Sequence, residues 1–197
     1  MRRTGAGVLA STRPTGCSSD AVARRLCNDR RVSLRPLGTE AFDAFVDGLD
    51  RPMFVVTVAH DGQRAGCLVG FATQVSIDPP RILVCLSVQN HTYRVASDAS
   101  LLAVHVLGQH QVALAELFGA VTGDDTDKLS HCSWHAGPSG VPLLDDCSRR
   151  LVGRVLQRVP FGDHVGFLLE PVEVEARGTA PALSLEQVDD LDPGHQA

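Results

Sequence analysis

The chain has 197 residues, of which 44% are hydrophobic and 21% charged, and it carries a formal net charge of −5. This length and hydrophobic content fit one domain of ordinary size with a buried core. An acidic chain with a single lysine does not favour a nucleic-acid-binding surface, and no apolar run approaches the roughly 18 residues that span a bilayer.

The first 31 residues hold seven arginines against Asp20 and Asp29, in a segment rich in glycine, serine and threonine. This composition predicts a disordered basic leader over residues 1–31. The apolar run after Arg2-Arg3 is too short, and too interrupted by glycine, for an export signal. Six cysteines occur without a Cys-x-x-Cys pair, so no disulfide framework is expected, and we expect the protein in the cytoplasm.

A helix is expected over residues 39–49, with Thr39 as its N-cap. Its apolar side chains recur at helical spacing and predict a stripe that faces the core. The stripe consists of Phe42, Phe45, Val46 and Leu49.

Short apolar runs separated by turn residues follow, and they predict strands. Asp61-Gly62 is typical of a tight hairpin turn, and Gly70 indicates a kink. Two further helices are expected over residues 90–95 and 109–118, and a long polar loop with Trp134 over 119–142. The expected strands span residues 53–59, 64–71, 73–77, 82–87, 100–107, 151–159 and 164–174.

These elements predict a mainly β fold with flanking helices, a closed or split antiparallel β-barrel. The runs at 82–87 and 100–107 are apolar on both faces, so the sheet must curl on itself or be covered. The domain is expected over residues 32–176, followed by an acidic tail over 177–197 that is frayed.

Three segments could carry a binding site. Where the strand ends at Ser87, Asn90 and Thr92 begin a helix and could hold a phosphate, although an ordinary Asn cap explains this segment alone at least as well. Between Cys67 and Ser76, glycine and alanine leave backbone that a flat ring could approach, although a bulged strand explains that segment alone. In Gly162-Asp163-His164 an imidazole could stand at the mouth of a pocket, or the segment could be a plain turn.

A metal site is not expected. His131, Cys132 and His135 lie in the predicted loop without a fourth ligand at a suitable spacing.

Taken together, these segments resemble the flavin reductase-like family of FMN-binding split barrels. The matching segments occur in the family's order and are spread across roughly residues 40–175. They are Pro52-Met53-Phe54-Val55-Val56-Thr57, residues 71–80, Asn90-His91-Thr92, Asp127-Lys128-Leu129, Pro142-Leu143-Leu144 and Gly162-Asp163-His164.

The resemblance implies a homodimer that binds FMN, or alternatively FAD, takes electrons from NADH or NADPH, and could supply reduced flavin to a partner monooxygenase. It places His164 near the reacting rings as the catalytic residue. The flavin ring would contact Val69, Gly70, Phe71, Ala72, Thr73, Gln74 and Ser76. The flavin phosphate would contact Ser87, Asn90, His91 and Thr92.

Leu68, Gly70 and His91 differ from the residues that many members carry at these positions. Two alternatives therefore remain open. One is a non-catalytic flavin-binding or electron-carrier protein, and the other is an oxidoreductase that uses a deazaflavin.

Overall fold

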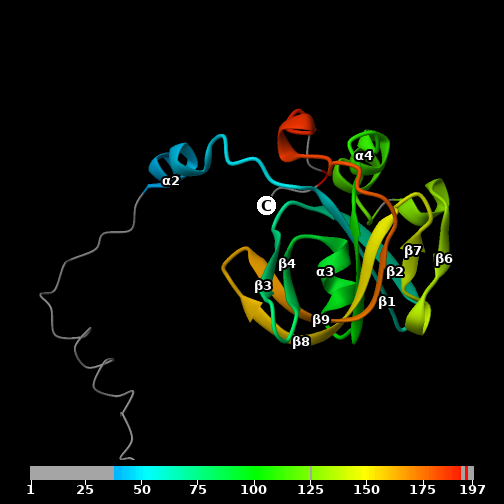
Figure 1. Ribbon diagram of the computed structural model, residues 1–197. Coiled ribbons are helices and arrows are strands. Elements are labelled where there is room, and N and C mark those ends of the chain that lie inside the picture. Colours follow the sequence, from blue (N-terminus) through cyan, green and yellow to red (C-terminus); the bar gives the residue numbers. More distant parts are fainter. Residues whose placement is uncertain (1–37, 125, 192–193, 195–197) are drawn as a thin grey trace, which may run out of the picture. The chain divides into compact units, whose positions relative to one another are not determined.

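The computed structural model describes residues 38–124, 126–191 and 194 (Figure 1). It divides into two compact units, Met1–Asp47 and Gly48–Ala197. The leader predicted for residues 1–31 lies outside the described residues. The described part of the first unit contains one helix, α2 (Thr39–Val46).

Helix α2 differs from its prediction in two respects. Its N-cap is Gly38 and no side chain caps it, so Thr39 is not the N-cap. No residue of the helix is buried: the side chains of Phe42 and Phe45 are 58% and 73% exposed. The predicted core-facing stripe is therefore wrong, because helical spacing of apolar residues predicts a helix but does not determine what covers it.

The second unit is built on a sheet of seven antiparallel strands in the order β2-β1-β5-β8-β9-β4-β3, which confirms the predicted mainly β architecture. The strands of this sheet are β1 (Phe54–His60), β2 (Gln63–Val69), β3 (Ala72–Ser76), β4 (Arg81–Ser87), β5 (Leu101–Val106), β8 (Arg149–Pro160) and β9 (His164–Ala176). The predicted Asp61-Gly62 turn joins β1 to β2, with both residues at positive φ.

A two-residue link closes this sheet into a split barrel. β2 and β3 are the two edge strands, yet only Gly70 and Phe71 separate them in the chain. So short a link spans roughly 10 Å at most, so the two edges must lie close together although no ladder joins them. Helix α3 (His91–Ala96) packs against β1, β2 and β4 at this open seam (Figure 1).

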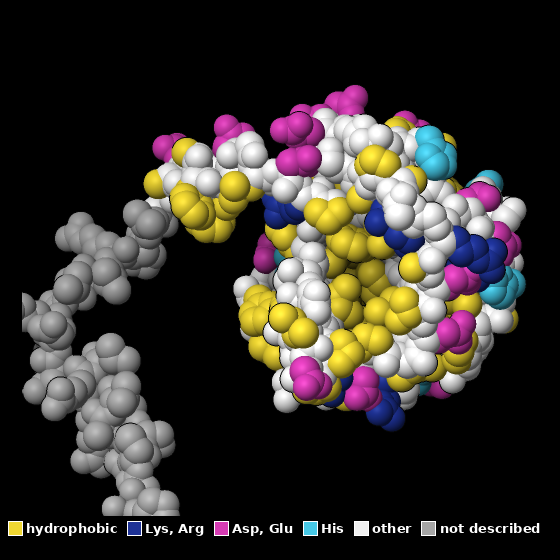
Figure 2. Space-filling model, in the orientation of Figure 1, with side chains coloured by type: hydrophobic (Ala, Val, Ile, Leu, Met, Phe, Trp, Pro, Cys, Tyr) yellow, Lys and Arg dark blue, Asp and Glu magenta, His cyan; other side chains and the backbone are white. Residues whose placement is uncertain are grey.

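Both faces of the central strands are buried, as their continuous apolar runs predict. Along β1, Val56 and Val58 belong to the cluster inside the barrel, whereas Val55 belongs to a second cluster outside it. Thr57 also faces outward and donates a hydrogen bond to Pro142 O at 2.5 Å. Figure 2 looks into the barrel, where hydrophobic side chains line a hollow at its centre.

The outer cluster is covered by helix α4 (Val112–Gly119), the 3-10 turns η1 (Lys128–His131) and η2 (Pro138–Gly140), and a two-stranded sheet of β6 (Trp134–Ala136) and β7 (Pro142–Leu144). The sequence predicted residues 119–142 as a loop, and β6 corrects this. Three-residue strands are too short to show an alternating pattern.

The segment after β9 is packed rather than frayed, at least to residue 191. Isolated bridges join Pro52 to Ser184 and Gly108 to Ala182, and the turn η3 (Leu185–Gln187) follows. Leu183 is fully buried in the outer cluster. The acidic residues of this segment hid its apolar spacing, which is why the sequence suggested a frayed tail.

Among the described residues, none of the helices has the length and apolar character needed to cross a membrane.

A buried histidine links the outer layer to the barrel through two hydrogen bonds. His105 on β5 is fully buried, its Nδ1 donates to Val55 O at 3.1 Å, and its Nε2 accepts from Leu144 N at 3.1 Å. Because an accepting Nε2 carries no proton, the contact with Leu144 N requires the neutral ring. Burial accordingly lowers the pKa of His105 from 6.5 to about 4.

This arrangement predicts a loss of stability in acid. Between pH 6.5 and 4 the unfolded chain binds a proton at His105 that the folded protein does not, so the free energy of unfolding falls as the pH falls. At pH 5 the loss relative to pH 7.5 is about 2 kcal/mol from this residue. Urea unfolding at both pH values should show a smaller pH difference for His105→Gln than for the wild type. If the free energy of unfolding changed equally with pH in both proteins, His105 would not be the source of the acid sensitivity.

Candidate functional site

Several residues that the sequence predicts for a ligand site line one cavity of about 390 Å³. They come from three places that are distant in the chain: the end of β2 and its link to β3, the end of β4, and the start of β9. These residues are Val69, Gly70, Phe71, Ser87, Asn90 and His164.

The cavity lies at the seam of the barrel because the β2–β3 link forms its wall. The chain bends at Gly70, and Phe71 O then accepts a hydrogen bond from Cys85 N of β4 at 2.9 Å. A Cβ added at Gly70 would come no closer than 3.6 Å to Met53 Sδ, which also lines the cavity. A Cβ at this position would therefore be in ordinary contact with Met53 and Arg51, and a larger side chain would need more room than the glycine leaves.

His164 is held in place by three neighbours: Ser87, Phe71 and Asp163. It pairs with Ser87 across β4 and β9, and its ring meets the ring of Phe71 edge-on at 5.2 Å. Its Nδ1 lies 3.0 Å from Asp163 Oδ1, and this contact lowers the pKa of the Asp163 carboxyl. The His164 side chain is 17% exposed, so an imidazole fixed by Asp163 stands at the edge of the cavity.

Arg51 lines the same cavity, although no sequence pattern pointed to it. Its guanidinium lies over the ring of Phe71, 4.8 Å from the centroid. Its Nε is buried and has no hydrogen-bond partner. A buried guanidinium donor without a partner is costly, and it is available to a polar or anionic ligand atom.

The segment predicted to contact phosphate has a structural role in α3. Asn90 caps the helix, since its Oδ1 accepts from Thr92 N at 3.3 Å. Thr92 is buried, and its hydroxyl hydrogen-bonds the Cys67 thiol. His91 lines a different hollow of about 230 Å³ and contacts Asp124 at 3.2 Å. The helix cap that the sequence favoured is thus present, and phosphate binding by these residues stays a prediction.

The remaining predicted residues lie on β3 and line none of the cavities described here. Thr73 and Gln74 are exposed, whereas Ala72 and Ser76 are partly buried. Backbone contact between this strand and a flat ring also stays a prediction.

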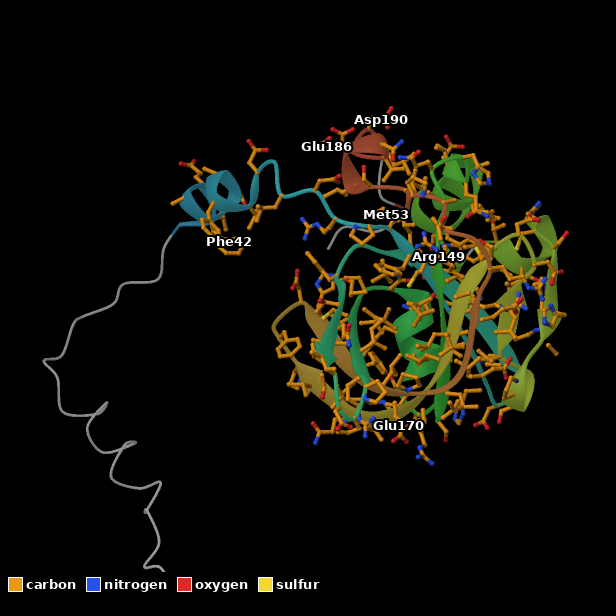
Figure 3. The ribbon with its side chains drawn as sticks, viewed as in Figure 1. Phe42, Met53, Arg149, Glu170, Glu186 and Asp190 are labelled. Atoms are coloured by element: carbon orange, nitrogen blue, oxygen red, sulfur yellow. The ribbon has the colours of Figure 1, made fainter. Side chains whose placement is uncertain are left out.

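A second cavity, of about 300 Å³, adjoins the first. The two share the lining residues Met53, Leu68, Ser87, Asn90 and Leu185. Arg51 lines the first cavity and Lys128 the second, so a groove runs between the partly buried Arg51 and the buried Lys128, with an apolar wall between them. Figure 3 shows Met53 at the start of β1, beside the C-terminal segment that contributes Leu185.

The volume of the groove and the chemistry of its lining residues fit a flavin nucleotide. Cofactor sites are typically about 300–1,000 Å³, mostly apolar, with a few placed polar groups. The groove offers a flat apolar wall for a ring, the side chains of Ser87 and Asn90, and unpaired donors on Arg51 and Lys128 for polar or anionic groups.

The cysteines and histidines offer little other chemistry. Burial raises the pKa of Cys67 to about 11, so this thiol stays protonated and is no nucleophile. His135, one of three residues considered for a metal, contacts Asp145 at 2.5 Å. Over the described ranges, no group of three His, Cys, Asp or Glu side chains is placed to hold a metal ion.

Comparisons with known proteins show a family relationship. The profile of the "Flavin reductase like domain" matches residues 46–187. The "FMN reductase (NADH) RutF" of Pseudomonas syringae is 30% identical over 143 residues, which cover 73% of this chain and 80% of the relative. A "4-nitrophenol 4-monooxygenase/4-nitrocatechol 2-monooxygenase, reductase component" of Rhodococcus opacus is 32% identical, covering 77% of this chain and 79% of the relative.

Solved structures show the same fold. The NADH:FAD oxidoreductase SgcE6 of Streptomyces globisporus superposes with a TM-score of 0.67 at 22% identity, covering 77% of this chain and 92% of that one. An FMN-binding protein of Thermus thermophilus gives a TM-score of 0.63 at 25% identity, covering 73% of this chain and 77% of that one. Cavity, fold and sequence relationship thus agree: this chain belongs to the flavin reductase-like family.

Proposed function

We propose that the protein is an NADH-dependent flavin reductase that binds FMN in the groove between Arg51 and Lys128. The observation that carries the proposal is the convergence of β2, β4 and β9 on one cavity in a chain of this family. When bound, FMN would supply the hydride-accepting chemistry, and the protein would supply binding, orientation and exclusion of water.

Each cavity residue has a role that follows from its position. The Gly70–Phe71 backbone and the apolar wall would hold the flavin ring. His164, fixed by Asp163, would contact the edge of the rings and orient the nicotinamide. Arg51 would donate to polar ring atoms through its unpartnered Nε. The positive charge of Arg51 would suit the negative charge that develops on the reduced ring, so no acid–base carboxylate pair is required.

The names of the relatives support NADH as the electron donor and a monooxygenase as the partner protein. The Pseudomonas relative is named for NADH and FMN, and the Rhodococcus relative is the reductase component of a monooxygenase. We infer NADH as donor, FMN or else FAD as acceptor, and delivery of reduced flavin to a monooxygenase in the cytoplasm.

We also infer a homodimer, because several large apolar side chains of the barrel are exposed. Ile77 after β3 is 85% exposed, Phe161 between β8 and β9 is 56%, and Val174 on β9 is 63%. Figure 2 shows hydrophobic side chains at the edge of the barrel where β3 lies. A monomer rarely leaves so many large apolar side chains in water.

The dimer is tested by light scattering after gel filtration. The wild type should elute at twice the monomer mass, and Ile77→Asp should shift the population towards the monomer because it buries a charge in the interface. Glu116→Ala, an exposed change on α4, serves as the control. A monomeric wild type would reject the homodimer.

The activity is tested without oxygen. Purified protein mixed with FMN and excess NADH should bleach the flavin absorbance faster than NADH and FMN alone, and His164→Asn should lower this rate. Bound flavin without NADH oxidation would instead identify a non-catalytic flavin carrier. Tighter binding of a deazaflavin than of FMN in a parallel titration would identify a deazaflavin-dependent oxidoreductase.

A graded series at Gly70 tests where the ring binds. Gly70→Ala adds a Cβ at an ordinary contact distance from Met53 and should change FMN affinity little. Gly70→Leu should fill the cavity and weaken FMN binding by roughly tenfold or more, while the melting temperature stays close to that of the wild type. FMN affinity unchanged in the leucine variant would place the ring elsewhere.

A further inference from the structure

Another cavity, of about 300 Å³, lies at the opposite end of β1 from the flavin groove. It opens between the β1–β2 turn and the segment from β6 to η2, which lie side by side (Figure 1). β1 has seven residues, so its two ends are roughly 20 Å apart. The cavity shares no lining residue with the two cavities of the groove, so it is separate from the proposed flavin site.

Two tight turns form the rims of this cavity. Each turn has two successive residues at positive φ, Asp61-Gly62 in the first and Ser139-Gly140 in the second. The last pair of the β1–β2 ladder closes the first turn, and a hydrogen bond from Gly137 N to Val141 O at 2.8 Å closes the second. Both rims are thus held by the backbone, and the cavity is formed without a ligand.

Trp134, the one tryptophan of the chain, forms a wall of the cavity. Its indole Nε1 donates to Leu129 O at 3.0 Å, and its ring packs against the outer cluster. The side chain is partly buried, so it is held in one orientation and still lines the cavity. A fixed aromatic surface of this kind suits a flat apolar ring.

Arg64 on β2 places a positive charge beside this ring. Its guanidinium lies over Trp134, 4.8 Å from the ring centroid. In the part of the chain that the structure describes, no carboxylate pairs with Arg64. The contact with the indole therefore holds the arginine without neutralising it. A guanidinium presents a planar fork of donors that matches a carboxylate.

Arg64 also borders the hollow that contains His91, whose carboxylates have other partners. Asp124 pairs with Arg94, and Asp127 caps η1. These contacts leave the positive charge of Arg64 for a ligand on the side of Trp134.

The remaining groups of the cavity limit the charge and the size of an anion. Asp61 lies at the rim, and its Oδ2 is 3.6 Å from His60 Nε2. The Asp61 carboxylate would repel a dianion, such as a phosphate monoester, more strongly than a monoanion. The cavity volume is at the lower end of the range for small-molecule sites, which favours a ligand with one ring.

We propose that this cavity binds a small aromatic monocarboxylate, with Arg64 as the ligand of the carboxylate and Trp134 as the surface on which the ring packs. The assignment goes beyond the reductase function and does not depend on it. The competing explanation is structural: a surface stack of Arg64 on Trp134 that only joins β2 to β6.

The single tryptophan makes binding directly measurable. Its indole N–H gives one resonance in a proton–nitrogen correlation spectrum, and the shift of this resonance is followed as benzoate is added to the full chain. Two further probes separate ring and charge. Cyclohexanecarboxylate keeps the charge without the aromatic ring, and benzamide keeps the ring without the charge.

Dissociation constants are measured for the wild type, Arg64→Met and a control, Arg154→Met. Arg154 is an exposed cation on β8 that pairs with Glu170 and lines none of these cavities. The control therefore removes a positive charge from the surface and leaves the proposed site intact.

We expect benzoate to saturate the shift in the wild type with a dissociation constant of about 1 mM or tighter. Arg64→Met should weaken benzoate binding roughly tenfold, the loss of a charged hydrogen bond, and Arg154→Met should not change it. Cyclohexanecarboxylate and benzamide should each bind at least about threefold more weakly than benzoate. No saturable shift with benzoate, or an unchanged constant in Arg64→Met, would overturn the proposal and leave the structural role.

Further arms separate other outcomes. If Arg64→Met does not fold, Arg64→Gln takes its place. Inorganic phosphate that binds as tightly as benzoate would overturn the aromatic carboxylate as the ligand class, and displacement of benzoate by FMN would overturn the position of the site. Protein that does not bind FMN would reject the proposed flavin function alone, and the benzoate constants would still decide the role of Arg64.

Discussion

The two-residue link between β2 and β3 is the constraint on which the rest of the structure depends. These strands are the opposite edges of the seven-stranded sheet, and Gly70 and Phe71 alone connect them. The hydrogen bond from Cys85 N to Phe71 O anchors the link to β4 and so fixes the width of the seam. A cavity between unpaired edges follows from this geometry, and α3 and the C-terminal segment border it rather than fill it.

Buried positive charge is the second feature of the site. Arg51 leaves its Nε without a partner, and Lys128 has one acceptor for three donors. Such groups reduce the stability of the free protein, because buried cations normally require a neutralising partner. Sites that break local rules in this way are typically functional, since the ligand supplies the missing interaction. The groove therefore combines an apolar wall with two cations that suit an anionic, flat cofactor.

Local sequence signals predicted most of the barrel and about half of the site. Features that depend on neighbouring residues could be predicted from the sequence. They include the alternating apolar runs, the Asp61-Gly62 turn and the Asn90 cap. The positions of Arg51, Lys128 and Leu185 depend on contacts between distant segments, and no short pattern encodes them. The same limit explains why the exposed face of α2 and the packed segment around Leu183 were mispredicted.

A crystal structure of the protein with FMN tests the central claim most directly. The account predicts that the flavin ring lies along the Gly70–Phe71 link and that Arg51 contacts a polar edge of the ring. A flavin bound outside the seam, or a flavin whose ring leaves Arg51 Nε without a partner, would contradict it.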